Sequence, residues 1–297
     1  MVALISQPLC AKESNMIRKE NLLMSYASGQ NFFTETFWVY VTSAQRNVPD
    51  ADIVFLTHDM PQEVRDKLED KDIEVVDVPE ADVLYIYRDR HLAFWNYLND
   101  HGHKYKYVMV ADCKDVVFQK SPADWVPDWK SRFDDIKGNR DFLENFVILV
   151  SEGFRMPASG FACIEHFEFE RDVQLPFLKR DKERYILNGG TMFGTPKEMQ
   201  NLHFLIWMTT MKSIGRITDQ ATLNWLMRYL EKEDTYCITH PQHDHFCLTG
   251  EGVKEGAVEP ILKEGVLYSP QGKPYHLIHQ WDRLDYFRED VLAQYDK

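Results

Sequence analysis

The chain has 297 residues and a formal net charge of −13 at pH 7. So acidic a chain is an unfavourable partner for nucleic acid, and its length suits one large α/β domain or two small ones. Five cysteines, an odd number without CxxC spacing, favour reduced thiols over a disulfide framework. The N-terminus lacks a basic region followed by a long apolar run, so we expect a cytoplasmic protein without a signal peptide or transmembrane segment.

The first half of the chain alternates apolar runs with helical patterns. Residues 1–30 form a weakly patterned lead, in which Ile17, Leu22, Leu23 and Tyr26 predict one face of a helix. Apolar runs at 37–41, 53–57 and 73–78 predict strands, and Pro61 opens a helix over 61–70. This alternation predicts an α/β fold with a mostly parallel central sheet flanked by helices.

Polar residues follow the first two predicted strands. Thr42 and Ser43 come after the first strand, and His58 and Asp59 after the second. The simplest interpretation of Thr42 and Ser43 is the start of a turn.

Two arginines lie at the entrance of a helix that Asp89 can cap and Gly102 can end. A guanidinium from Arg88 or Arg90 could bind a carboxylate or a diphosphate in a bidentate geometry that lysine does not match. A surface arginine paired with a neighbouring aspartate is the alternative.

The stretch YKYVMVADCKDVVFQKSP, residues 105–122, carries the strongest chemical signal. A strand over 107–110 ends in Asp112 and Asp115, and a second apolar run follows. Two carboxylates on one turn can offer oxygens to a hard cation such as Mg²⁺ or Mn²⁺. A pair of solvated turn aspartates would give the same pattern.

Residues 121–184 are rich in aromatic and charged side chains and predict an insertion beside the site. The next segment, YILNGGTMFGT, predicts a strand broken at Asn188, Gly189 and Gly190. Paired glycines allow positive φ or close backbone approach to a ligand. A hairpin turn is the simpler interpretation.

Helices are predicted over 202–211 and from Thr218 or Asp219 onward, with Gln220 in the first turn of the second. A carboxylate at this position is explained by the helix dipole alone. A function for Asp219 therefore depends on which other motifs occur with it.

Histidines concentrate in the last quarter of the chain. His240, His243 and His245, with Asp244 among them, could bind zinc, although no HExxH motif occurs. A loop that closes over a ligand is the other interpretation of this segment, residues 239–250.

Four motifs, in this order, resemble those of glycosyltransferases with the GT-A fold, and are similar to glycogenin and to bacterial lipopolysaccharide galactosyltransferases. They are the acidic pair, the Asn-Gly-Gly run, the Asp-Gln pair at a helix start, and the run Gly-Lys-Pro-Tyr at 272–275 with the histidines that follow. This sequence has Asp-Cys-Lys-Asp where the family commonly has Asp-x-Asp. The resemblance covers residues 35–285. It implies a single GT-A-like domain over 31–297, with a nucleotide-binding half at 35–120 and an acceptor half with a C-terminal closing segment at 121–297.

The resemblance further implies a metal-dependent transfer of sugar from a nucleotide diphosphate, most commonly of UDP, to an acceptor hydroxyl on a glycan or glycoconjugate. The implied ligands of Mn²⁺ or Mg²⁺ are Asp112, Asp115 and His279. Asp219, with Gln220 and Asn188, would lie at the reacting sugar, as a general base in an inverting enzyme or as a sugar-orienting group in a retaining one. The implied donor-binding residues are Thr42, Ser43, Asp59, Arg88, Arg90, Asp112, Gly189, Gly190, Lys273 and His276.

Three alternatives belong to other functional classes. A sugar nucleotidyltransferase would share a related sheet, but no glycine-rich phosphate loop follows the predicted first strand. A zinc-dependent hydrolase would use the histidines at 240–245. A catalytically silent binding module would keep the fold and lose metal dependence.

Overall fold

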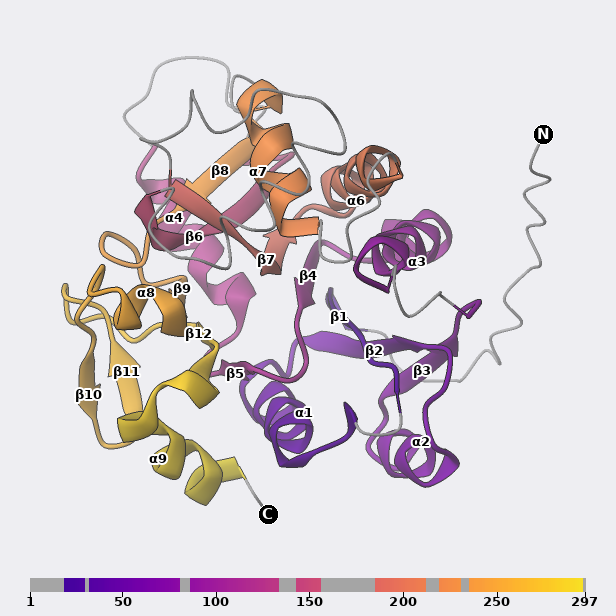
Figure 1. The fold of residues 1–297 in the computed structure, drawn as a ribbon, viewed down its shortest axis with the longest axis horizontal. Coiled ribbons are helices and arrows are strands. Elements are labelled where there is room, and N and C mark those ends of the chain that lie inside the picture. Colours follow the sequence, from indigo (N-terminus) through magenta and orange to yellow (C-terminus); the bar gives the residue numbers. More distant parts are fainter. Residues whose placement is uncertain are drawn as a thin grey trace.

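The computed structural model describes residues 19–29, 32–80, 86–133, 143–155, 185–211, 219–230 and 235–295. In this part of the chain the centre is a seven-stranded sheet with the order β3-β2-β1-β4-β7-β6-β8 (Figure 1). The strands are β1 (Asn21–Tyr26), β2 (Ala51–Thr57), β3 (Glu74–Asp77), β4 (Tyr107–Ala111), β6 (Val147–Arg155), β7 (Tyr185–Gly194) and β8 (Tyr236–Thr239). Among them β7 alone runs antiparallel to its neighbours, so the predicted mostly parallel sheet is confirmed.

Helices cover both faces of the sheet, as predicted. Successive residues of β1 serve opposite faces: Leu23 packs in one apolar cluster, and Leu22 and Met24 in the other. The first cluster includes α1 (Glu35–Asn47), α2 (Gln62–Glu69) and α4 (Trp125–Ser131). The second includes α3 (Ile86–His101), α6 (Pro196–Thr210) and α7 (Asp219–Leu230). In Figure 1, α1 and α2 lie on one side of β1 and β2, and α3 and α6 lie on the other.

A smaller sheet brings strands from the C-terminal part of the chain next to β5, the strand that follows β4. It consists of β5 (Val116–Phe118), β12 (Leu277–His279) and β9 (Cys247–Thr249), in that order. Strand β12 is antiparallel to β5 and parallel to β9. Around it lie α8 (Gly250–Lys254), α9 (Asp285–Tyr295) and the hairpin of β10 (Ile261–Lys263) with β11 (Val266–Tyr268).

The predicted strand at 37–41 is wrong, because these residues belong to α1. Phe37, Tyr40 and Val41 face the main core while Val39 packs into a third apolar cluster, so the helix is buried on two sides and the run 37–41 is apolar throughout. Thr42 and Ser43 are therefore helical and do not follow a strand.

The true first strand, β1, lies inside the 1–30 lead, where the prediction of a helix face is wrong for Leu22, Leu23 and Tyr26. Ile17 lies outside the described residues. The strands predicted at 53–57, 73–78 and 107–110 are confirmed as β2, β3 and β4. No helix in the described ranges is long and apolar enough to cross a bilayer.

Candidate active site

The three predicted metal ligands meet at the carboxyl end of β4. Asp112 directly follows β4, Asp115 precedes β5, and His279 ends β12. One ligand atom from each residue lies within 4.8 Å of the others, and the described ranges contain no other group of three or more such residues. His279 Nε2 lies 3.4 Å from Asp115 Oδ1.

Pairing between β5 and β12 explains why residues so distant in sequence meet. In this antiparallel register Val116 is opposite His279, so the residue before β5 lies beside the imidazole. The backbone N–H of Trp281 also donates to the carbonyl of Asp115 (3.3 Å). The loop between β4 and β5 is thereby held against the C-terminal segment.

The properties of this group fit a small hard cation. Asp115 Oδ1 is buried without a hydrogen-bond partner among the described residues. A Cβ on Gly190 would lie 2.5 Å from Asp112 Oδ2 and 2.8 Å from His279 Nε2, so only glycine leaves these atoms their room. Two carboxylates and an imidazole suit Mn²⁺ or, with more water ligands, Mg²⁺.

The electrostatics of the group also favour a cation. Burial raises the pKa of the Asp112 carboxyl, against the opposing charge of Arg90. Burial acts to lower the pKa of His279, but the carboxylates of Asp115 and Asp112 prevail and raise it to about 8. The raised pKa of this imidazole shows that its surroundings are strongly negative, and such surroundings attract a cation.

Arg90 joins the acidic pair to the predicted carboxylate on α7. Its Nη1 donates to Asp112 Oδ1 (2.7 Å), and its Nη2 donates to Asp219 Oδ2 (2.5 Å) and to the carbonyl of Gly189 (3.5 Å). The Arg90 side chain is 14% exposed, and the planar fork of its guanidinium spans both acids as a single ammonium would not. Three separate predicted motifs thus meet at one side chain.

The Asn-Gly-Gly run lies along the same edge. Gly190 donates its N–H to Asn188 Oδ1 (2.7 Å) and accepts the Asp112 N–H at its carbonyl (2.8 Å). Asn188 Nδ2 donates to Glu152 Oε1 (2.7 Å). Glu152 is buried and its pKa is raised by burial. The sequence analysis missed Glu152, although it is an isolated acid within the apolar run 146–154.

Asp219 is the first described residue of α7, at the predicted start of this helix, while Thr218, the other predicted start, lies outside the described residues. Burial opposes ionisation, yet the charge of Arg90 and contacts to His91 and the Gln220 N–H lower the pKa of Asp219 to about 2. Gln220 uses its amide to donate to the Leu187 carbonyl (3.0 Å). The side chain of Gln220 thus anchors the helix to β7, and the sugar contact predicted for it stays untested.

Four of the residues predicted to contact the nucleotide-sugar donor bond to other parts of the chain, and Ser43 and Arg88 are two of them. Ser43 Oγ donates to the Tyr40 carbonyl (3.0 Å) and accepts the Phe118 N–H (3.2 Å), so its hydroxyl serves packing of α1 against β5. Arg88 forms two hydrogen bonds with Asp89 (2.6 and 3.1 Å), as the alternative interpretation had it.

Lys273 and His276 also bond away from the metal-ligand group. Lys273 is 53% exposed and pairs with Asp128 (2.6 Å). His276 is buried, its Nδ1 lies 2.6 Å from the Ser121 carbonyl, and burial lowers its pKa to about 4. The contacts of these two residues do not support the predicted roles.

Asp59 lies where the carboxyl ends of β1 and β2 adjoin. Its Oδ1 accepts hydrogen bonds from Ser28 Oγ (2.7 Å) and from the Gly29 N–H (2.5 Å). Burial acts to raise its pKa, but these bonds and the charge of His58 outweigh burial and lower the pKa. Its predicted contact with a nucleotide stays a prediction.

The histidines at 240–245 do not form a metal-ligand group among the described residues. His240 Nδ1 bonds to Ser151 Oγ (2.8 Å), and His245 Nε2 faces Asp128 (3.4 Å). Asp244 accepts a hydrogen bond from the indole of Trp125 (2.8 Å). The segment therefore gives a zinc hydrolase no support.

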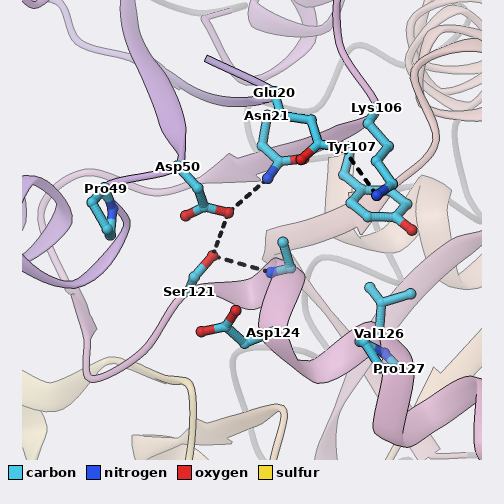
Figure 2. Close-up of a pocket in the computed structure, with 11 residues that line it drawn as sticks. Glu20, Asn21, Pro49, Asp50, Lys106, Tyr107, Ser121, Asp124, Val126 and Pro127 are labelled. Atoms are coloured by element: carbon cyan, nitrogen blue, oxygen red, sulfur yellow. Dashed lines mark hydrogen bonds and ion pairs between the residues drawn. The ribbon is translucent and has the colours of Figure 1, made fainter.

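A separate cavity of about 450 Å³ lies at the opposite end of the sheet, where β1 and β4 begin (Figure 2). Carboxylates of Glu20, Asp50 and Asp124 line it, and its Lys106 is already ion-paired with Glu20 (3.0 Å). Its charge disfavours a nucleotide diphosphate. None of the predicted site residues lines this cavity.

No protein-family model matches the sequence, and no curated protein matches it. Among solved structures, the chain is similar to the galactosyltransferase LgtC in a crystal structure with donor and acceptor sugar analogues. The TM-score is 0.49 at 14% sequence identity, over 92% of this chain and 95% of that chain. A likeness of this degree assigns neither a donor nor an acceptor to the present chain, so a functional assignment has to come from its own side chains.

Proposed function

We propose that this protein is a metal-dependent glycosyltransferase that moves a sugar from a nucleotide diphosphate, UDP in the first instance, to an acceptor hydroxyl on a glycan or glycoconjugate. The observation that carries the proposal is the convergence of Asp112, Asp115 and His279 within 4.8 Å, joined through Arg90 to Asp219. These residues come from motifs in four regions of the chain. A structural role for each alone would not require them to meet.

In this proposal the two ends of the site divide the work. Asp112, Asp115 and His279 would hold Mn²⁺ or Mg²⁺, which would supply Lewis-acid stabilisation of the negative charge that builds up on the leaving diphosphate. Gly190 keeps its backbone close to the ligands because a side chain there would collide with two of them.

Asp219 is suited to act as a fixed negative charge. A general base works best when its pKa lies near the operating pH, whereas the pKa of Asp219 is lowered to about 2. Oδ2 accepts from Arg90 (2.5 Å) and Oδ1 from the Gln220 N–H (2.8 Å), so both oxygens are already engaged. We therefore assign Asp219 to orienting the donor sugar and stabilising positive charge at its anomeric carbon, as the retaining alternative requires.

The competing classes find less support. After the true first strand, β1, the sequence ASGQNFF contains one glycine, Gly29, rather than the glycine-rich phosphate loop of a nucleotidyltransferase. A silent binding module would not need a carboxylate held ionised beside the metal-ligand group. The histidines at 240–245 bond to other side chains.

A two-part experiment tests the proposal. Calorimetry with UDP, GDP and CDP, with and without Mn²⁺, should give nucleotide binding that depends on the metal, and a panel of nucleotide sugars should include one that is slowly hydrolysed. Asp115→Ala should abolish the metal-dependent part of binding, and Lys273→Ala is the matched surface control. A nucleotide affinity that changes neither on addition of Mn²⁺ nor in Asp115→Ala would refute the assignment.

A further inference from the structure

Behind Asp219 lies a pair of buried histidines that the proposed reaction does not use. His91 follows Arg90 on α3, His203 lies on α6, and their exposed fractions are 1% and 0%. The two Nδ1 atoms are 2.8 Å apart, and the rings are tilted by 35° with centroids 5.1 Å apart. His91 Nε2 lies 3.6 Å from Asp219 Oδ2. Three helices therefore meet in the line His203, His91, Asp219.

The geometry of this line selects one tautomer for each ring. The short contact between the two Nδ1 atoms requires one proton between them. If His91 supplied it, the bare lone pair of its Nε2 would face the ionised Asp219 carboxylate. If His203 supplies it, His91 carries its proton on Nε2 and directs a positive N–H dipole at Oδ2. At 3.6 Å this is an electrostatic contact rather than a hydrogen bond, but its sign still decides between the arrangements.

Both rings are neutral in this arrangement. Burial lowers the pKa of His91, supported by the charge of Arg90 and opposed by Asp219. Burial also holds the pKa of His203 well below its usual range, and His91 and Arg90 act in the same direction. The remaining nitrogen, His203 Nε2, has no hydrogen-bond partner in the described part of the chain. The His203 ring packs against Phe94 of the apolar cluster of α3 and α6, with 5.1 Å between the ring centroids.

We propose that His203 and His91 are positioning residues that form a fixed-tautomer relay: His203 Nδ1–H donates to His91 Nδ1, and His91 Nε2–H faces Asp219 Oδ2. The relay holds the carboxylate of Asp219 in place through its Oδ2. Its effect on catalysis rests on the proposed function, whereas the tautomers themselves do not.

The tautomers are tested directly by NMR of protein labelled with ¹⁵N-histidine, since each neutral tautomer gives a distinct pattern of long-range ¹H–¹⁵N couplings. We expect a proton on Nε2 of His91 and on Nδ1 of His203, with no titration between about pH 6 and pH 8. A proton on Nδ1 of His91, or a histidinium signal from either ring, would overturn the relay. This measurement needs no substrate, so it stands even if no sugar transfer is found.

Paired variants test the positioning role. His91→Gln keeps an N–H near the Nε2 position and His91→Leu removes it; His203→Asn and His203→Leu do the same at the Nδ1 position. The leucine variants should lower kcat on the order of tenfold, with donor KM and Mn²⁺ affinity unchanged, because His91→Leu removes the N–H that faces Asp219 and His203→Leu no longer fixes that proton on Nε2 of His91. The amide variants should restore most of this rate. Equal rates in the leucine and amide variants, with similar unfolding midpoints, would show that the histidines only fill space.

Discussion

Gly190 gives the sharpest test of the metal-ligand group, because the three atoms nearest to a methyl group there all belong to Asp112 and His279. In Gly190→Ala the added Cβ would lie 2.5 Å from Asp112 Oδ2 and 2.8 Å from His279 Nε2. Non-bonded heavy atoms come to rest about 3.5 Å apart, so the Asp112 oxygen must retreat by roughly 1 Å and the His279 nitrogen by roughly 0.7 Å. Each is the far end of a side chain, so the fold can absorb the shift. A metal site cannot, because ligand distances hold to within about 0.2 Å.

We therefore expect Gly190→Ala to weaken Mn²⁺ binding by at least about 100-fold, with the unfolding midpoint lowered by only a few degrees. The assay is a Mn²⁺ titration that follows the EPR signal of the free ion, with thermal unfolding of the same samples. Gly189→Ala is the matched control, since the three atoms nearest its Cβ would all belong to Gln220, the first at 3.2 Å, and not to a metal ligand. Wild-type Mn²⁺ affinity in Gly190→Ala would refute the reasoning, and equal loss in both variants would assign the effect to the backbone.

Three further substitutions probe other parts of the site. Arg90→Lys should lower turnover of a nucleotide sugar about 100-fold at saturating Mn²⁺, because one ammonium cannot hold two carboxylates in register, and steady-state kinetics within about threefold of wild type would contradict this. Burial lowers the pKa of His276 to about 4 from an ordinary 6.5, so the unfolded chain binds the extra proton and stability falls by up to about 3 kcal/mol as pH falls through that window. His276→Asn keeps a donor for the Ser121 carbonyl without titrating, so its urea midpoint should fall less between pH 7 and pH 5; parallel curves would be evidence against this linkage. Lys273→Ala removes an exposed ion pair with Asp128, so we expect a change in unfolding free energy below about 1 kcal/mol and unaltered binding of UDP with Mn²⁺ in calorimetry, whereas lost binding would reinstate its predicted contact with the diphosphate.

The sequence predicted the site residues best where a polar side chain interrupts an apolar run. Asp112 and Asp115 stand out because β4 and β5 are apolar on both sides of them, and Asn188 stands out within β7 for the same reason. His279 was reached through the resemblance to a family, since its neighbour His276 carries the same local signal and bonds elsewhere. The local sequence indicates which residues are candidates, and only the fold shows which of the two histidines lies beside the acidic pair.

The failures have a common physical origin in burial on two sides. Helix α1 packs Tyr40 on the main core and Val39 on the C-terminal cluster, so its apolar run shows no helical period and resembles a strand. Strand β1 lies between two parallel neighbours, β2 and β4, where both faces of the sheet are covered and no alternation with polar residues arises. Glu152 and the His91–His203 pair act through contacts that span 36 and 112 residues, which no local pattern reveals.

The antiparallel strand is what makes the site possible. In a wholly parallel sheet the neighbour of β4 would end where β4 ends, and its own following loop would have to supply every contact. Because β7 runs the other way, its register places Thr191 opposite Ala111, and the residues just before Thr191 extend past the end of β4. Gly190 thus accepts the Asp112 N–H (2.8 Å), and its missing side chain leaves room for the carboxylate and the imidazole. A strand reversal and a glycine at one position together set the spacing on which metal binding would depend.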